Sequence, residues 1–237
     1  SLAGTINVPF CPEAPLSGVN HKDFMYCVWY KRKISFEPAR LTGKRVLLHF
    51  GAADYETKVW LNGISVGVPH VGGNSSFTYD ITPYIKDGEN ILTVACYDDT
   101  RSPHQPSGKQ SLSYHSEVCK YTRTTGIWQT VWMEYVPTAY IKSFKLIPDI
   151  ENCTLGVSAQ LCGAGTLNLE ASYEGKVVGS LSLKTARGGF VSGTMVLSEL
   201  HLWEIGKGGL YDLVFKLEND TVKSYFGMRK YSIMKDD

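Results

Sequence analysis

The stretch KVWLNGISVG, residues 58–67, decides the fold class of this chain. Its two short apolar runs flank Asn62-Gly63, the strongest local signal for a two-residue type I′ turn, because both turn residues must adopt a positive φ. We therefore predict a β-hairpin. Counted outward from the turn, the predicted pairs are Leu61 with Ile64, Trp60 with Ser65, and Val59 with Val66.

The two faces of the predicted hairpin differ in character. Side chains alternate between the faces of a strand, so one face carries four aliphatic side chains and is expected to lie in a core. They are Val59, Leu61, Ile64 and Val66. Trp60 lies on the other face among polar neighbours. Either another part of the chain or an adjoining domain covers Trp60, or its ring is free to stack on a ligand.

The composition is that of a chain that folds in water. Its 237 residues suit one large β domain or two of ordinary size, and 43% hydrophobic residues are enough to form cores. Twenty-four basic and 23 acidic residues leave a net charge of +1 without a basic cluster, so we expect no nucleic-acid partner. Apolar runs such as VLLHF (46–50) are far shorter than the ~20 residues that cross a bilayer, so we expect no membrane partner.

Six cysteines are spread along the chain without a C-x-x-C pair or a regular spacing, which argues against a disulfide framework. Free thiols are typical of a reducing compartment, so the cysteines favour a cytoplasmic location over a periplasmic or secreted one. The six are Cys11, Cys27, Cys96, Cys119, Cys153 and Cys162.

Strand-like runs recur about every eight to twelve residues and helical periodicity is nearly absent, which predicts an all-β chain of antiparallel sandwiches. In the run 44–51, alternation places Val46, Leu48 and Phe50 together on a core face. The other runs before Pro137 are 25–36, 58–67, 75–81, 90–98 and 126–136.

A second set of short strands begins at Pro137. About 100 residues follow, the size of an immunoglobulin-like module. Its clearest strand is LYDLVFKLE (210–218), followed by a turn at Asn219-Asp220. We therefore predict two domains, residues 1–136 and 137–237.

Signatures of phosphate and dinucleotide binding, Gly-Lys-Ser/Thr and Gly-x-Gly-x-x-Gly, are absent from the sequence. His115 and Cys119 are the nearest approach to a metal-binding pair, but a zinc site needs three or four such ligands. We therefore expect neither a metal nor a cofactor.

Two pairs of acidic residues are candidates for chemistry on carbohydrate, because glycoside hydrolysis uses two carboxylates. Asp54 and Glu56 stand just before the hairpin, where ordinary turn and edge roles are the simpler interpretation. Asp98 and Asp99 follow a strand and precede a long polar loop, so they point to opposite faces if the strand continues.

Aromatic rings are the other means of holding sugars. Trp128 and Trp132 lie four residues apart on one predicted strand, and Trp29 lies in a dense apolar run. We predict that these three rings are buried, in a core or between domains.

An ordered series of motifs resembles the N-terminal region of glycoside hydrolase family 2, the β-galactosidase and β-glucuronidase family. The series covers nearly the whole chain. It comprises VPFCPE (8–13), LSG (16–18), VWYKRKISF (28–36), VLLHFGAADYETKVWLNGISVG (46–67), GGNSSFTYDIT (72–82), DGENILTV (87–94), QPSGKQ (105–110), TRTTGIWQTVWMEYVP (122–137), LHLWEIGKGGLYDL (200–213) and SYFGMRKYSI (224–233).

The resemblance implies a jelly-roll sugar-binding domain, then an immunoglobulin-like domain, then a (β/α)8 barrel. In the family the barrel carries both catalytic glutamates, one of them directly after an asparagine. No Asn-Glu dipeptide occurs in this sequence. We therefore expect a non-catalytic part of a retaining, β-galactosidase-like enzyme, acting on a β-glycoside together with its own downstream barrel and compatible with a homo-oligomer. Members also carry a strand before the VPF segment, so the first sheet is expected to lack one edge.

The resemblance also assigns candidate substrate-contacting positions. Asp98 or Asp99 is expected to accept hydrogen bonds from sugar hydroxyls, and the match does not choose between them. Lys109, Gln110 and Arg123 are expected to orient the loop or to meet the barrel. The alternative function is an independent carbohydrate-binding or lectin-like module in which Trp60 forms a stacking platform.

Overall fold

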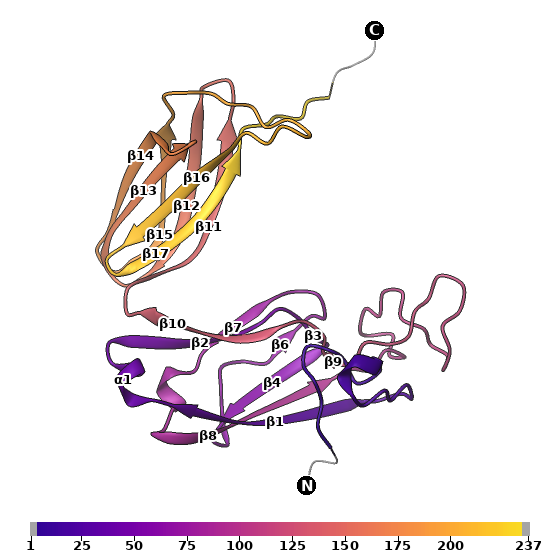
Figure 1. Ribbon diagram of the computed structural model, residues 1–237. Coiled ribbons are helices and arrows are strands. Elements are labelled where there is room, and N and C mark those ends of the chain that lie inside the picture. Colours follow the sequence, from indigo (N-terminus) through magenta and orange to yellow (C-terminus); the bar gives the residue numbers. More distant parts are fainter. Residues whose placement is uncertain (1–3, 234–237) are drawn as a thin grey trace. The chain divides into compact units, whose positions relative to one another are not determined.

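A computed structural model describes residues 4–233, and the chain divides into two units between Tyr135 and Val136 (Figure 1). Both units are β-sandwiches, so the predicted all-β class, a jelly roll followed by an immunoglobulin-like fold, is confirmed. No helix in the described residues is long and apolar enough to cross a membrane.

The first unit contains two main sheets. In the larger sheet β8 lies between β1 and β4, and β5 and β6 both pair with β4. The strands of this sheet are β1 (Cys27–Phe36), β8 (Gly88–Tyr97), β4 (Glu56–Leu61), β5 (Ile64–Ser65) and β6 (His70–Val71). The smaller sheet has the order β10 (Val131–Pro137), β2 (Lys44–Phe50) and β7 (Phe77–Asp80). Outside them are the strand pair β3 (Ala53–Asp54) and β9 (Gly126–Ile127), the helix α1 (Pro38–Leu41), and the 3₁₀ turns Pro15–Ser17 and Thr82–Tyr84.

The core of the first unit follows the predicted alternation. Val46, Leu48 and Phe50 of β2 are buried, as expected. One side of this sandwich is open, because no strand of the described chain pairs with the outer edge of β1 or of β10. A cavity of about 1110 Å³ lies along those two strands, and it reaches the core side chains Phe50 and Val94.

The hairpin forms with the predicted register. Trp60 pairs with Ser65 and Leu61 with Ile64, while Asn62 and Gly63 both adopt positive φ. One burial expectation is wrong: Ile64 pairs with the buried Leu61 but is itself 51% exposed, because β5 is a two-residue strand at the edge of the sheet. The other three aliphatic side chains, Val59, Leu61 and Val66, are buried.

Trp60 is covered by another part of the chain. Its ring stacks on that of Trp29, with 5.5 Å between centroids and 18° between planes. Register explains the contact, because Trp29 faces Ala95 of β8 while Trp60 faces Thr93, on the same outer face. The prediction for Trp29 is therefore wrong as regards the core, since 47% of this residue is exposed on that outer face.

Trp128 and Trp132 do not share a strand, because β9 ends at Ile127 and β10 begins at Val131. The Trp128 indole N–H donates to the carbonyl of Gly73 at 2.8 Å. Trp132 is 45% exposed within its unit and stacks on His49. The predicted single strand from 126 to 136 is thus interrupted.

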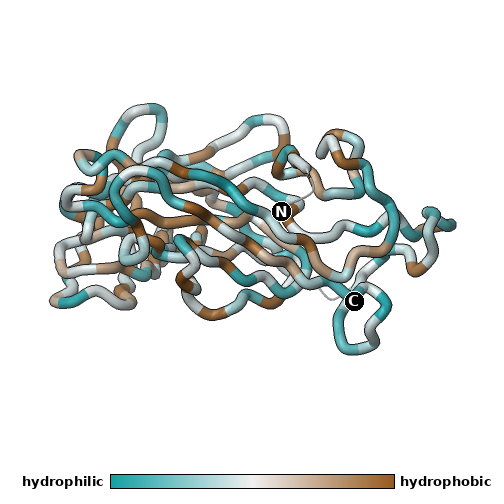
Figure 2. The backbone as a smooth tube through the Cα atoms, turned by 90° about the horizontal axis from the view of Figure 1, so that it is seen from below, coloured by the Kyte–Doolittle hydropathy of each residue, from teal (hydrophilic) through white to brown (hydrophobic). Residues whose placement is uncertain are grey.

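The second unit packs a three-stranded sheet on a four-stranded one, and buried residues alternate with less buried ones along its strand β12 (Thr154–Cys162). Hydrophobic and hydrophilic stretches follow one another at short intervals along the whole backbone (Figure 2). Tyr211, Leu213, Phe215 and Leu217 are all fully buried, which confirms the alternation expected for that strand. The turn after it lies one residue earlier than predicted, because Glu218 adopts the positive φ. The three-stranded sheet has the order β11 (Tyr140–Asp149), β12 (Thr154–Cys162) and β15 (Gly188–Val196). The four-stranded sheet has the order β14 (Lys176–Thr185), β13 (Gly165–Tyr173), β16 (Leu210–Leu217) and β17 (Asp220–Gly227).

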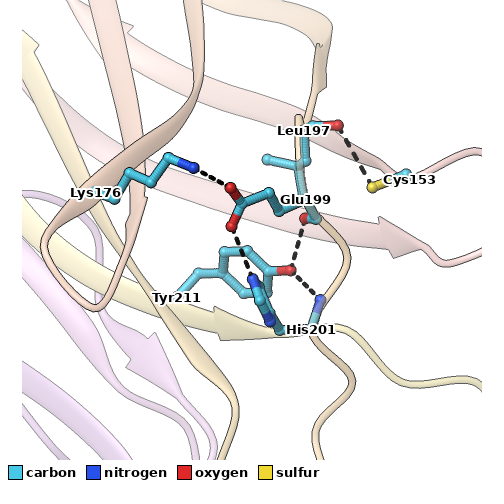
Figure 3. A network of polar contacts seen from close by, with 6 residues as sticks. All are labelled: Cys153, Lys176, Leu197, Glu199, His201 and Tyr211. Atoms are coloured by element: carbon cyan, nitrogen blue, oxygen red, sulfur yellow. Dashed lines mark hydrogen bonds and ion pairs between the residues drawn. The ribbon is translucent and has the colours of Figure 1, made fainter.

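Tyr211, at the start of β16, anchors the loop before that strand (Figure 3). Its hydroxyl donates to the Glu199 carbonyl at 3.0 Å and accepts the His201 backbone N–H at 2.6 Å. This arrangement is the tyrosine corner of immunoglobulin-like sandwiches. Lys176 pairs with the carboxylate of Glu199 and holds its pKa below the usual range.

Replacing Tyr211 by Phe is expected to lower the unfolding free energy of the second unit by about 1–3 kcal/mol, because both backbone partners lose their hydrogen bond. Urea denaturation followed by circular dichroism measures the change. Tyr225→Phe, on the neighbouring strand and exposed, is the control and should leave the transition unchanged. An equal effect of both variants would contradict the role given to the Tyr211 hydroxyl.

Candidate functional site

The alternation of β8 separates Asp98 from Asp99. Leu92, Val94 and Cys96 point into the core, and Asp98 continues this series just after the strand ends. Asp98 is accordingly only 3% exposed, whereas Asp99 points the other way and is half-buried. The structure thus distinguishes two neighbouring carboxylates that the sequence leaves equivalent.

Gln105 holds both of these residues. Its Nε2 donates to Asp98 Oδ1 at 2.5 Å, and its Oε1 accepts the backbone N–H of Asp99 at 3.1 Å. Asp98 Oδ2 is buried and has no hydrogen-bond partner within residues 4–233. One Asp99 oxygen, Oδ1, accepts the Arg101 backbone N–H at 3.3 Å.

Two further buried carboxylates lie in the same region. Gln110 donates from Nε2 to Asp54 Oδ2 at 3.0 Å, and its own oxygen accepts the Thr124 N–H at 2.8 Å. Glu13 accepts the backbone N–H of Thr125, with distances of 3.1 and 3.2 Å to its two oxygens. None of the ion pairs in the described residues includes one of these three carboxylates.

Burial without a cationic partner raises the pKa values of two of these acids, Asp98 and Asp54. Desolvation, the largest cause, and the nearby charge of Asp54 together raise the pKa of Asp98 to about 7, although the hydrogen bond from Gln105 opposes the shift. Desolvation likewise raises the pKa of Asp54 to about 6, with the Gln110 hydrogen bond again opposing. Asp54 and Asp98 therefore have pKa values close to neutral pH, as titratable groups at functional sites commonly do.

Arg123 fixes the loop that follows Asp99. Its buried guanidinium donates to the carbonyls of Ser113 at 2.5 Å, Ser111 at 3.2 Å, and Lys22. The same group lies 4.0 Å from the Phe24 ring centroid. Arg123 thus joins the loop to the segment before β1 and does not face solvent.

The five candidate residues therefore occupy different environments. Gln110 donates a hydrogen bond to Asp54, and the charge of Asp54 in turn raises the pKa of Asp98. Lys109 is exposed, and its backbone carbonyl accepts the Tyr121 N–H at 3.0 Å. Whether any of the five touches a sugar stays a prediction.

The sequence analysis did not single out two members of the cluster, Glu13 and Gln105, and it named a third, Asp54, only as a candidate paired with Glu56. The interpretation of Asp54 as an ordinary turn or edge residue is wrong, since its side chain is buried. The two alanines directly before Asp54 are the one local sequence feature that indicates a buried position, and both Ala52 and Ala53 are fully buried in the structure. No local pattern marks Glu13, whose partner Thr125 is distant in sequence.

Two possible sites for other chemistry do not form. GISVG (63–67) matches the Gly-x-Ser-x-Gly pattern of hydrolase nucleophiles, but it lies in the hairpin and not in the strand–turn–helix that this motif requires. No group of three or more His, Cys, Asp or Glu side chains in the described part of the chain is arranged to hold a metal ion. All six cysteines are unpaired.

Comparison with known proteins defines the class. The model of the glycosyl hydrolases family 2 sugar-binding domain matches residues 7–133, more than half of the chain. The chain therefore belongs to glycoside hydrolase family 2, and its first unit is the sugar-binding domain of that family.

Relatives lie among β-galactosidases and β-glucuronidases. The β-galactosidase large subunit of Leuconostoc lactis is 27% identical over 82% of this chain and 31% of its own length. The β-glucuronidase of Sus scrofa is 29% identical over 77% of this chain and 30% of its own. The chain thus spans about 30% of the length of these curated relatives.

Solved structures agree in fold. A β-glucuronidase of Faecalibacterium prausnitzii matches with a TM-score of 0.72 and 27% identity, over 95% of this chain and 41% of that one. The Bifidobacterium dentium β-glucuronidase complexed with coumarin-3-O-glucuronide matches with a TM-score of 0.76 and 22% identity, over 97% of this chain and 43% of that one. At that identity the second match supports the fold alone.

The buried acid at position 98 makes stability depend on pH. Its pKa rises on folding from about 4 in the unfolded chain, to about 7 in the folded one, so the folded state binds the proton more tightly. The contribution to the unfolding free energy therefore falls as pH rises from about 4 to 7, by about 1.4 kcal/mol per unit of pKa displacement.

Wild type and Asp98→Asn are therefore expected to differ in urea denaturation in a pH-dependent way, with the wild type losing stability relative to the variant between pH 4.5 and 7.5. Tryptophan fluorescence reports mainly on the first unit, which contains Trp29, Trp60, Trp128 and Trp132. A stability difference that stays constant over this range would contradict the burial of an ionisable Asp98.

Arg123→Lys is expected to loosen the loop of residues 98–125, because one ammonium cannot reach three carbonyls arranged around a planar guanidinium. Limited proteolysis with mass spectrometry should show cleavage in the loop about tenfold faster than in the wild type. The matched control is Arg101→Lys, which also removes a guanidinium from the Phe24 ring but at an exposed position. Equal cleavage rates in both variants would contradict the role of the Arg123 guanidinium in holding this loop.

Proposed function

We propose that this chain is a non-catalytic part of a β-glycosidase, in which its sandwiches buttress a catalytic barrel and the end of β8 completes one wall of the substrate pocket. Membership of glycoside hydrolase family 2 supports the enzyme class. The relatives' greater length supports a catalytic region elsewhere in the protein.

The observation that carries this proposal is the pair of adjacent carboxylates at the end of β8. Asp98 is buried and held by Gln105, so the backbone that presents Asp99 is fixed. Asp99 is the more accessible of the two, and a carboxylate makes charge-assisted hydrogen bonds to sugar hydroxyls. We assign sugar contact to Asp99 and positioning to Asp98.

The remaining candidates receive supporting roles in the proposal. Gln110 and Arg123 order the loop from within, since both side chains are buried. Lys109 is exposed on the same loop and is available to contact the barrel.

The charge of the site favours a galactoside over a glucuronide. A uronate brings a carboxylate of its own, which an ionised Asp99 would repel at close range. A neutral galactoside lacks this repulsion and offers hydroxyl donors instead. The proposed substrate is therefore a β-galactoside.

The alternative function, an independent carbohydrate-binding module, depends on a stacking platform at Trp60. The contact between Trp60 and Trp29 weakens that alternative, because each ring already uses one face for the other. This alternative function predicts that the chain alone binds a glycan saturably and that Trp60→Ala abolishes the binding while the fold stays intact.

The longer protein is expected to hydrolyse chromogenic β-galactosides, and this chain alone is expected to hydrolyse none. Asp99→Asn in the longer protein should lower kcat/KM about ten- to a hundredfold, the value of one charge-assisted hydrogen bond. Asp87→Asn, an exposed aspartate at the opposite end of β8, is the control. Unchanged kcat/KM in Asp99→Asn would remove Asp99 from the site.

Calorimetric titration separates the two candidate functions. Galactose or glucuronic acid added to this chain should bind more weakly than submillimolar, because a single wall gives little of the concave burial on which small-ligand affinity depends. Submillimolar binding that disappears in Trp60→Ala would support an independent carbohydrate-binding module and contradict the proposal that this chain supports a catalytic barrel.

A further inference from the structure

The segment of residues 22–26, just before β1, packs against the end of β8. The Lys22 carbonyl accepts a hydrogen bond from the Arg123 guanidinium, and the Tyr26 carbonyl accepts the Asp98 backbone N–H at 3.0 Å. Between these two points, the Phe24 ring centroid lies 4.0 Å from the Arg123 guanidinium. The segment is therefore held at three positions beside the candidate acids.

A small hollow separates this segment from the chain that follows β8. Its volume is about 20 Å³, enough for one water molecule or for one hydroxyl group of a ligand. Residues 24–26 line it from one segment, and residues 98–101 line it from the other. Tyr26 and Asp99 are therefore neighbours at one hollow, although they are far apart in the sequence.

The Tyr26 side chain does not continue the alternation of β1. Val28 and Tyr30 pack in the core, and a strand extended by two residues would direct Tyr26 inward as well. However, β1 begins only at Cys27, and Tyr26 is 67% exposed. No aromatic ring or cationic side chain within residues 4–233 stacks on the Tyr26 ring. This ring is therefore open to a ligand.

A galactosyl ring matches this combination of groups. The C–H faces of a pyranose are apolar and pack against aromatic rings, whereas its hydroxyl groups donate hydrogen bonds to carboxylates. In galactose the axial hydroxyl at C4 leaves the C–H bonds of C3, C4 and C5 on one face, which gives a broad apolar surface. Such a ring can lay this face on Tyr26 while one of its hydroxyl groups reaches Asp99 at the hollow.

We propose that Tyr26 is the platform on which the galactosyl ring of the substrate stacks. The inference rests on the proposed function for the substrate class, and it adds an apolar contact to the polar contact assigned to Asp99. Tyr26 is a binding residue in this proposal, because the ring face is covered to the same extent before and during bond cleavage. Such uniform binding affects KM more than kcat.

Steady-state kinetics of the longer protein test the proposal. Tyr26→Ala should raise KM for β-galactosides about tenfold and leave kcat within about twofold of the wild-type value. Tyr26→Phe keeps the ring face and should resemble the wild type. Because Tyr26 is exposed, neither substitution should change the melting temperature. The matched control is Tyr225→Ala, which removes a 66% exposed tyrosine from the second unit and should change neither constant.

Two kinetic results would overturn the proposal. One is an unchanged KM in Tyr26→Ala. The other is an equal loss in Tyr26→Phe and Tyr26→Ala, since the hydroxyl group and not the ring face would then make the contact.

The leaving group distinguishes a contact with the sugar from a contact with the aglycone. Methyl and nitrophenyl β-galactosides share the galactosyl ring and differ in the group that departs, so Tyr26→Ala should weaken both by the same factor. A loss confined to the nitrophenyl compound would place Tyr26 against the aglycone and overturn the assignment.

Saturation-transfer NMR with galactose measures binding without hydrolysis, so it separates this inference from the proposed function. In the longer protein, Tyr26→Ala should reduce the saturation transferred to the ring protons of galactose. If the protein hydrolyses no glycoside but shows this Tyr26-dependent binding, the enzyme assignment fails and the stacking site stands. If it hydrolyses β-galactosides and Tyr26→Ala changes neither KM nor the NMR signal, the stacking site fails and the enzyme assignment stands. Absence of both hydrolysis and galactose binding would refute both.

Discussion

Pairing of β8 on both of its edges is the constraint on which the first unit depends. Residues 88–97 pair with all of β1, and residues 92–97 pair with β4. A strand held on both sides cannot slip by one residue without turning every core side chain to the outer face. This register therefore determines at once that Val94 is in the core, that Trp29 and Trp60 meet outside, and that Asp98 points inward.

The inward aspartate has an energetic cost that the surrounding amides offset only in part. Glu13, Asp54 and Asp98 come from three separate segments, and their hydrogen-bond donors are Gln105, Gln110 and backbone N–H groups. Desolvation raises the pKa values of Asp54 and Asp98, and the neutral amide donors oppose this rise less than a cation would. In return, the arrangement ties the N-terminal segment, β3 and the loop after β8 to one point, where an accessible Asp99 is presented.

Local patterns in the sequence predict the parts of this structure that depend on local geometry. The Asn62-Gly63 turn, the alternation of β2 and that of β16 all follow from the two-residue period of a strand and from turn stereochemistry. The failures are nonlocal or lie at element ends. Ile64 is exposed because the sheet ends there, and Trp29 is outside because register with β8 decides its face.

The candidate site divides in the same way. The family resemblance proposes Asp98, Asp99, Lys109, Gln110 and Arg123 as candidates, and strand alternation predicts that the two carboxylates lie on opposite faces. They do not reveal that Gln105 holds both, because a loop conformation is needed to return that amide to β8. Nor do they reveal Glu13, since its partner Thr125 is brought near only by the fold.

Under the proposed function, a half-buried Asp99 supplies one sugar contact to a pocket formed mainly by the barrel, so this domain would contribute to catalysis without being a strong sugar binder. A charge-assisted hydrogen bond contributes about 1.5–3 kcal/mol, less than the 4 kcal/mol or more that association costs in lost translational and rotational freedom. Alone, such a contact does not hold a free monosaccharide. In a pocket whose other contacts already offset the entropic cost of association, the same hydrogen bond adds its whole free energy to binding. A hydrogen bond that is stronger in the transition state than in the ground state also lowers the activation barrier. The free energy of one hydrogen bond is thus too small to bind a free sugar, but it is large enough to strengthen binding in a pocket that other contacts complete.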